Sequence, residues 1–189
     1  MTEKDILDIF HTNNALLTGH FKLSSGLHSQ NYLQCALILQ HPDIAAKFAK
    51  EIAKRFSKEK IDVVIGPALG GITLAYEIAR ALKTRGLFTE RQDGKMVLRR
   101  GFSLKSGEIA LVVEDVITTG GSTKEVIDVV KDLGGIVAGV ASIMDRSSEQ
   151  VNFGVRFEPL ARIKIETYKE EDCPLCKQGI PITKPGSRK

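Results

Sequence analysis

The sequence predicts an α/β protein with a mostly parallel central sheet flanked by helices, and three observations support that prediction. Short apolar, β-branched runs recur along the chain at 61–66, 109–115 and 136–145. Segments with apolar residues at helical spacing separate these runs. Each run also ends in a loop of glycine, hydroxyl or charged residues. Because ligands bind beyond the carboxyl ends of parallel strands, we expect one site where these loops meet.

Local patterns place the elements that precede the first buried strand. Apolar residues at helical spacing, the last of them Leu17, predict a helix over 3–17. Turn-forming residues between 19 and 26 predict a turn or a short hairpin. Asp43 is expected to cap a second helix, whose buried face extends to Phe56.

The middle of the chain alternates between apolar and glycine-rich or basic segments. The expected strand at 61–66 runs into the loop 66–71, and a helix should then continue to about Leu82. The segment 89–101 is polar and basic, with a central Asp-Gly turn signal. We therefore expect an exposed excursion at this point.

The second half of the chain should complete the sheet. Ser122 is expected to start a helix, with Glu125 three residues later as its capping-box partner. The Gly134-Gly135 pair should end that helix. Buried strands are expected at 109–115, at 136–145 and, last, at 162–166.

Size and charge limit the class of protein. At 189 residues the chain is expected to form a single domain over 1–189. A net charge of +4 permits an anionic small ligand but does not indicate nucleic acid. No apolar run approaches the roughly 20 residues that span a bilayer, so we expect no membrane partner. Three cysteines do not make a disulfide framework, which favours a reducing cytoplasm.

The segment LVVEDVITTGGST at 111–123 carries the chemistry that the sequence shows most clearly. Glycines let backbone N–H groups turn toward one point, and the helix that follows adds its positive N-terminal end. The hydroxyls of the TTGGST loop add neutral donors. This loop lacks the lysine of a nucleoside-triphosphate P-loop, so it predicts a cradle for a simpler phosphate.

Two adjacent carboxylates, Glu114 and Asp115, come just before that cradle. Carboxylates accept hydrogen bonds from ribose hydroxyls, directly or around Mg²⁺. A phosphate cradle beside such a pair predicts a pocket for ribose 5-phosphate. The alternative is an ordinary strand-to-helix turn with a capped helix, which requires neither two acids nor four hydroxyls.

The segment VVEDVITTGGST resembles the phosphoribosyl-pyrophosphate (PRPP) signature of the type I phosphoribosyltransferases. Nearly the whole chain resembles the orotate phosphoribosyltransferase family, through FKLSSGLHSQNY, GPALGG, ERQDGK, the MDR strand end and the tail CPLCKQGIPITKPGSR. The resemblance implies a core at about 43–150 and a small hood formed by 1–42 and 151–189. It also implies transfer of a phosphoribosyl group from PRPP to orotate, in pyrimidine synthesis.

The resemblance assigns roles to individual residues. It implies PRPP binding by Arg91, Lys95, Glu114, Asp115, Val116, Ile117, Thr118, Thr119, Gly120, Gly121 and Ser122, with Lys95, Glu114 and Asp115 as catalytic residues. Orotate is expected to contact Thr118, Tyr32 and Arg146, the last as the partner of its carboxylate. Mg²⁺ is the expected cofactor, held mainly through PRPP, with Glu114 and Asp115 as candidates for contact.

The family also implies a homodimer in which the loop 89–101 closes over the neighbouring subunit. For Arg91 and Lys95 the alternative is a solvated basic hairpin, and Arg99 and Arg100 are closer to that alternative. The orotate contacts also have alternatives: Arg146 could be an ordinary surface arginine, and Tyr32 could simply pack in the core.

Two departures from the family pattern concern lysines. Other branches carry lysine at the positions of Ser24 and Gly70, so two cations that contact PRPP are not carried over. The backbone of the loop 66–71 remains expected to contact pyrophosphate, with a tight strand-to-helix turn as its alternative.

The tail contains a single Cys173-x-x-Cys176 pair. A structural zinc site normally needs four ligands, and Cys35, His20 and His28 could contribute, although nothing in the spacing demands it. A redox role would require a lowered thiol pKa. We expect a tail packed on the domain.

Two other functions stay open at this point. One is a phosphoribosyltransferase for a purine base, which would keep the PRPP site and change the residues that contact the base. A regulatory module that senses PRPP and binds nucleic acid would need a basic, aromatic-bearing face, which the modest charge and the absence of tryptophan do not favour.

Overall fold

The structure is a computed structural model that describes residues 1–23 and 25–185 of the chain. Its large sheet has the strand order β5-β4-β3-β6-β7-β8, with every neighbouring pair parallel except β4 and β5. Its strands are β3 (Val63–Pro67), β4 (Arg85–Gln92), β5 (Lys95–Leu98), β6 (Ile109–Ile117), β7 (Ile136–Asp145) and β8 (Phe157–Arg162). The predicted mostly parallel α/β sheet is confirmed.

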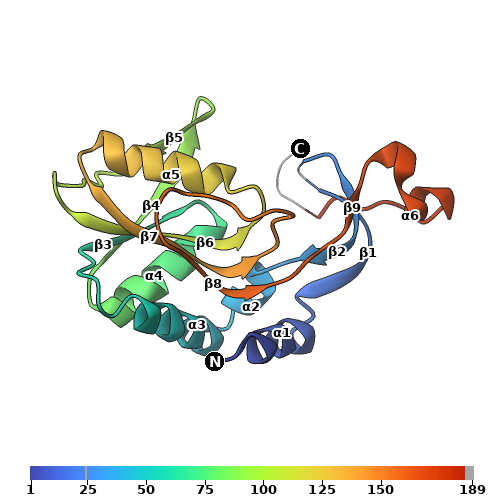
Figure 1. The fold of residues 1–189 in the computed structure, drawn as a ribbon, viewed down its shortest axis with the longest axis horizontal. Helices are drawn as coiled ribbons and strands as arrows, with labels where there is room; N and C mark the ends of the chain where they lie inside the picture. The colour runs from blue at the N-terminus through green and yellow to red at the C-terminus, as the bar shows by residue number, and fades with distance from the viewer. Residues whose placement is uncertain (24, 186–189) are drawn as a thin grey trace.

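Helices cover both faces of this sheet (Figure 1). The helices α3 (Pro42–Arg55) and α4 (Gly70–Leu82) lie on one face, and α5 (Gly121–Asp132) lies on the other. Successive residues of β6 point to opposite faces. Leu111 therefore packs in the core beneath α3 and α4, whereas Val112 packs in the core beneath α5.

A second, smaller sheet stands beside the large one (Figure 1). It consists of β1 (Leu16–Lys22), β2 (His28–Leu33) and the short β9 (Thr167–Tyr168), all antiparallel. The remaining elements are α1 (Glu3–Thr12), α2 (Ala36–Leu39), the 3₁₀ turn η1 (Glu170–Asp172) and α6 (Pro174–Lys177). The N-terminal hairpin and a short C-terminal strand thus share one sheet.

The first predicted helix was too long. α1 has a capping box between Thr2 and Asp5, and it ends at Thr12 because Asn14 adopts a left-handed conformation with φ 51°. Leu17 consequently lies in β1. The turn signals at 19–26 did predict a hairpin, although its strands reach further than expected.

Asp43 does not cap α3. His41 is the N-cap residue, and Pro42 occupies the first helical turn, where its missing N–H costs nothing. Asp43 instead lies in that first turn, where its charge is favourable to the helix dipole. The expected buried face is present, with Phe48, Ile52 and Phe56 fully buried.

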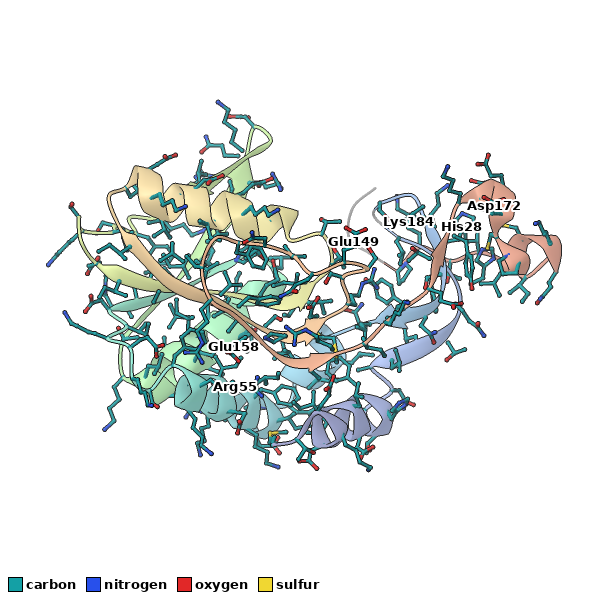
Figure 2. All side chains as sticks on the ribbon, in the orientation of Figure 1. His28, Arg55, Glu149, Glu158, Asp172 and Lys184 are labelled. Carbon is teal, nitrogen blue, oxygen red and sulfur yellow. The ribbon has the colours of Figure 1, made fainter. Side chains whose placement is uncertain are left out.

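The last strand of the large sheet begins earlier than the predicted 162–166. β8 contains Pro159, which weakens a sequence-based prediction of a strand, but β8 is an edge strand and edge strands tolerate proline. Arg55 of α3 donates a hydrogen bond to the Pro159 carbonyl at 2.7 Å and lies beside Glu158 (Figure 2). The large sheet thus extends beyond residue 150.

The basic segment 89–101 is an antiparallel hairpin of β4 and β5 at the other edge of the sheet. Its turn is formed by Asp93 and Gly94, both with positive φ. Among residues 1–23 and 25–185, no helix is long and apolar enough to cross a membrane.

Candidate functional site

The loop after β6 borders a cavity of about 300 Å³ at the carboxyl end of the strand. The cavity is lined by Arg91, Glu114, Glu125 and the continuous segment Val116, Ile117, Thr118, Thr119, Gly120, Gly121, Ser122 and Thr123. The structure therefore brings together nearly all the residues expected to bind PRPP. The walls are predominantly hydroxyl, amide and charged groups, which suits a phosphate rather than an apolar ligand.

Glu125 does not form the predicted capping box with Ser122. α5 begins after Gly120, whose φ of 74° is left-handed, and no side chain caps the helix. The first-turn N–H groups of α5 are therefore not satisfied by a side-chain cap at the cavity wall. Glu125 instead pairs with Arg91 at 2.7 Å.

Gly120 cannot be replaced without moving its surroundings. A Cβ atom there would lie 2.8 Å from Phe153 and 2.8 Å from Val151, in addition to the strain of the positive φ. We expect Gly120→Ala to lower stability by about 1–3 kcal/mol and to lower kcat/KM for PRPP, because the phosphate loop shifts. Thermal unfolding and initial rates test both effects.

Gly107→Ala is the matched control for that prediction. Gly107 has a φ of 81°, and among the described residues none lies within 4 Å of its hypothetical Cβ. Gly107→Ala should lower stability only through the strain of the positive φ, and it should leave the kinetics unchanged. Equal kinetics in the two variants would contradict a phosphate role for the Gly120 loop.

Glu114 and Asp115 border different cavities. Because they are consecutive strand residues, Glu114 lies with the loop on the α5 side and Asp115 points toward α4. Asp115 borders a second cavity of about 560 Å³, which is also lined by Tyr32, Leu69 and Gly70. One residue of this consecutive pair therefore lies in the lining of each cavity.

Gly70 explains one of the missing lysines. A Cβ atom on Gly70 would lie 2.6–2.7 Å from the carboxylate of Asp115, so any side chain there would collide with that acid. In this chain the start of α4 and the Asp115 carboxylate fill the space that a side chain at position 70 would need. Ser24, the other position, lies outside the described residues.

Burial raises the pKa of the Asp115 carboxyl above its ordinary value of 3.8. Hydrogen bonds oppose this effect, among them one of 2.8 Å from the Val116 N–H. Desolvation is the larger influence. The protein therefore holds a carboxylate in a place where its charge is unfavourable until a ligand or cation arrives, which is typical of functional sites.

Arg146 and Tyr32 lie close enough to influence each other and belong to the region around Asp115. Burial lowers the pKa of Arg146 and raises that of Tyr32, while each group opposes the shift in the other. Arg146 is half-buried, and its backbone N–H donates to the Ile117 carbonyl at 2.9 Å. The carboxylate next to it in the chain, Asp145, pairs with Arg162 and not with Arg146.

The neighbouring Asp145 is committed elsewhere. Its carboxylate accepts hydrogen bonds from Ser147 and from Arg162 Nε, the latter at 3.2 Å. A half-buried guanidinium that the adjacent Asp145 does not pair is suited to an anionic ligand, because burying an unpaired charge is costly. Thr118, which was expected to approach the same ligand, lines the phosphate cavity and not the cavity of Tyr32.

Arg91 and Lys95 of the basic hairpin differ in their contacts. Arg91 lines the phosphate cavity of its own chain, held by Glu125 and by the Gly94 carbonyl at 2.8 Å. Lys95 is exposed at the start of β5 and lines neither of the two cavities. The structure of the single chain therefore brings Arg91, but not Lys95, to the candidate site.

Arg99 and Arg100 are engaged within the hairpin. Both pair with Glu90, at 3.8 and 2.9 Å respectively, and Arg100 also lies over the Phe88 ring. These contacts agree with the alternative prediction, in which Arg99 and Arg100 belong to a solvated basic hairpin.

The loop 66–71 was expected to direct its backbone N–H groups toward pyrophosphate, but at least one of them is used inside the fold. The Ala68 N–H donates to the Thr89 carbonyl at 2.7 Å, so that amide is used inside the fold. Leu69 and Gly70 do line the cavity of Asp115, and Leu69 is 78% exposed. Gln34 and Pro185 line the same cavity, and sequence reasoning missed both: Gln34 belongs to no motif, and Pro185 entered only as part of the tail that resembles the family.

The fold and the loop after β6 define an α/β protein of the type I phosphoribosyltransferase class. The family model described as "Phosphoribosyl transferase domain" matches residues 36–153. The chain belongs to the orotate phosphoribosyltransferase family, as its relatives show.

Curated relatives named orotate phosphoribosyltransferase match over the full length. The one from Desulforamulus reducens is 56% identical over 188 residues, covering 100% of this chain and 98% of its own. That from Pelotomaculum thermopropionicum is 57% identical over 189 residues, covering 100% of both. The crystal structure of orotate phosphoribosyltransferase from Aeropyrum pernix superimposes with a TM-score of 0.68 at 25% identity, covering 84% of this chain and 93% of the other.

Proposed function

We propose that this chain transfers the 5-phosphoribosyl group of PRPP to orotate, giving orotidine 5′-monophosphate and pyrophosphate in pyrimidine synthesis. The observation that carries the choice of base is Arg146, a half-buried guanidinium beside Tyr32 whose neighbouring carboxylate, Asp145, pairs with Arg162 instead. A planar carboxylate suits bidentate binding by such a group. Full-length relatives named for the same activity support the proposal.

The 5′-phosphate belongs in the cavity of the TTGGST loop, at the N-terminus of α5. The ribose then lies over the end of β6, where Glu114 and Asp115 accept hydrogen bonds from its hydroxyls. Pyrophosphate and base occupy the larger cavity bounded by Asp115, Leu69 and Tyr32. One PRPP molecule thereby spans the two cavities.

The reaction breaks the bond between C1 of the ribose and the pyrophosphate oxygen, and forms a bond from C1 to a ring nitrogen of orotate, whose proton is released to the departing pyrophosphate or to water. The electron pair of the broken bond leaves with pyrophosphate. The ribose passes through an oxocarbenium-like state, so the carboxylates of Glu114 and Asp115 stabilise developing positive charge. We expect no covalent protein nucleophile, because positioning and electrostatics suffice.

Mg²⁺ fits the donors that the structure offers. Carboxylate oxygens are the ligands that this hard cation prefers, and Asp115 is held in a place where its charge requires compensation. Glu114 and Asp115 are the residues that would contact Mg²⁺ carried in by PRPP. When bound, the ion neutralises charge on the departing pyrophosphate.

Dimerisation belongs to this proposal as well. Lys95 is exposed on β5 and lines neither of the two cavities of its own chain, so a catalytic role would be exerted on a neighbouring subunit. Arg91 is placed to act within its own chain. We also propose a cytoplasmic location, because all three cysteines are unbridged.

The test mixes the purified protein with PRPP, Mg²⁺ and orotate and follows the loss of orotate absorbance. Adenine, xanthine and uracil are assayed in parallel. We expect turnover with orotate alone, and none without Mg²⁺. Turnover with another base would overturn the role of Arg146, and PRPP binding without any turnover would favour a regulatory module.

A further inference from the structure

Four potential metal ligands that are distant in the sequence meet in the hood. They are His20 of β1, His28 of β2, and Cys173 and Cys176, which flank the start of α6. Their ligand atoms all lie within 4.8 Å of one another. His20 and His28 are 3% and 2% exposed and Cys173 is fully buried, while Cys176 is the most exposed of the four. Figure 2 shows His28 next to the segment that carries Asp172 and α6.

The spacing of the four atoms is that of a tetrahedral zinc site. With Zn–N bonds of about 2.0–2.1 Å and Zn–S bonds of about 2.3 Å, the edges of the tetrahedron are about 3.3 Å for N to N and about 3.6 Å for N to S. His20 Nε2 lies 3.0 Å from His28 Nδ1, 3.6 Å from Cys173 Sγ and 3.8 Å from Cys176 Sγ. His28 Nδ1 lies 3.3 Å from Cys176 Sγ.

The outer contacts of the histidines fix which nitrogen faces the cluster. His20 Nδ1 lies 2.7 Å from the Ile180 carbonyl, which can only accept, so Nδ1 carries the proton and Nε2 presents a lone pair to the centre. This arrangement, a ligand nitrogen opposite a backbone-bound N–H, is usual around protein-bound metals.

His28 distinguishes a metal site from a simple hydrogen bond. If His28 Nδ1–H donated to His20, Nε2 would be a buried lone pair, and Nε2 has no hydrogen-bond partner among the described residues. The nearest charged group is the Glu170 carboxylate at 3.9 Å, an acceptor that would face this lone pair unfavourably. With a metal on Nδ1, Nε2 carries a proton that points toward Glu170, and this conflict disappears.

The tail has little else to hold it. Of the described residues 169–185, Cys173 and Leu175 are the buried apolar side chains, and Ile180 and Ile182 are 39% and 44% exposed. Segments with so small a core usually need a disulfide or a metal, and the cysteines are free. The tail nevertheless runs along β1, where the Thr183 N–H donates to the His20 carbonyl at 2.8 Å.

We propose that His20, His28, Cys173 and Cys176 bind one structural Zn²⁺ ion that fastens the C-terminal tail to the β1–β2 hairpin. All four residues lie outside the matched domain at 36–153. The tail then continues to Pro185, which lines the cavity of Asp115 and Tyr32. The zinc site therefore also fixes one wall of the proposed substrate cavity.

The test measures zinc in the full-length protein after purification without chelators. We expect one Zn²⁺ per chain in the natural sequence and a loss of at least tenfold in Cys173→Ser and Cys176→Ser. Cys35→Ala and His11→Gln serve as matched controls, since Cys35 is buried outside the cluster and His11 is an exposed histidine. Both controls should retain full stoichiometry.

Cobalt substitution keeps the test valid if the cysteine variants do not fold. We expect the natural sequence loaded with Co²⁺ to show the intense visible bands of tetrahedral coordination and a thiolate charge-transfer band. Removing the metal should also speed tryptic cleavage after Lys177 several-fold. Metal-free protein that does not retain added Zn²⁺, octahedral Co²⁺ spectra, or a Cys173–Cys176 disulfide in the native protein would each overturn the proposal.

Discussion

Arg146→Ala is expected to raise KM for orotate and to lower kcat/KM by about 100-fold or more, while PRPP binding is unchanged. The orotate carboxylate would lose a charge-assisted, bidentate partner, and such hydrogen bonds contribute about 1.5–3 kcal/mol each. Steady-state kinetics with each substrate varied in turn, together with PRPP binding by calorimetry, measures the two halves of the prediction.

The preference for orotate over uracil gives a second measurement of the same contact. Uracil lacks the carboxylate, so the preference for orotate over uracil should shrink in Arg146→Ala by the same factor as kcat/KM. Arg80→Gln is the control, because Arg80 is an exposed arginine that pairs with Glu77 on α4 at 2.6 Å. If Arg146→Ala kept its preference for orotate, another residue would have to bind the carboxylate.

Asp115→Asn should change activity and stability in opposite directions. Loss of a charged acceptor for the ribose is expected to lower kcat/KM for PRPP by about 10–100-fold. Removal of a buried charge should raise the free energy of unfolding by about 1 kcal/mol, which corresponds to about 2–4 °C in Tm. Initial rates and calorimetric melting of the ligand-free protein test both effects.

The pH dependence gives the sign of the stability effect. The pKa of Asp115 is raised in the folded state, so the folded protein binds this proton more tightly than the unfolded chain does. Its contribution is most favourable below the ordinary value of 3.8 and is lost as the pH rises through the folded pKa. At neutral pH the natural protein should therefore be less stable than Asp115→Asn.

Asp128→Asn is the control for this pair of effects. Asp128 is an exposed acid on α5, and its neutralisation should change neither Tm nor kinetics. A lower Tm in Asp115→Asn would mean that the hydrogen bond from Val116 outweighs the desolvation of the carboxylate, contrary to this prediction.

Local patterns were enough to predict most of the sheet and the phosphate loop. Apolar runs gave β3, β6 and β7, because a strand buried on both faces needs nearly continuous apolar residues. The TTGGST loop was recognisable because its chemistry is encoded in consecutive residues. The errors arose at element ends, where Asn14, Pro42 and Pro159 change the boundary by backbone conformation.

What the sequence by itself determined is the fold class, the phosphate loop and the acid pair, since each depends on residues that are neighbours in the chain. Only the tertiary structure decided which distant groups meet. It placed Asp115 against Gly70, assigned Glu125 to Arg91, and set Arg146 beside Tyr32. It also joined His20 to Cys173 across 153 positions, because long-range contacts follow from packing and not from local spacing.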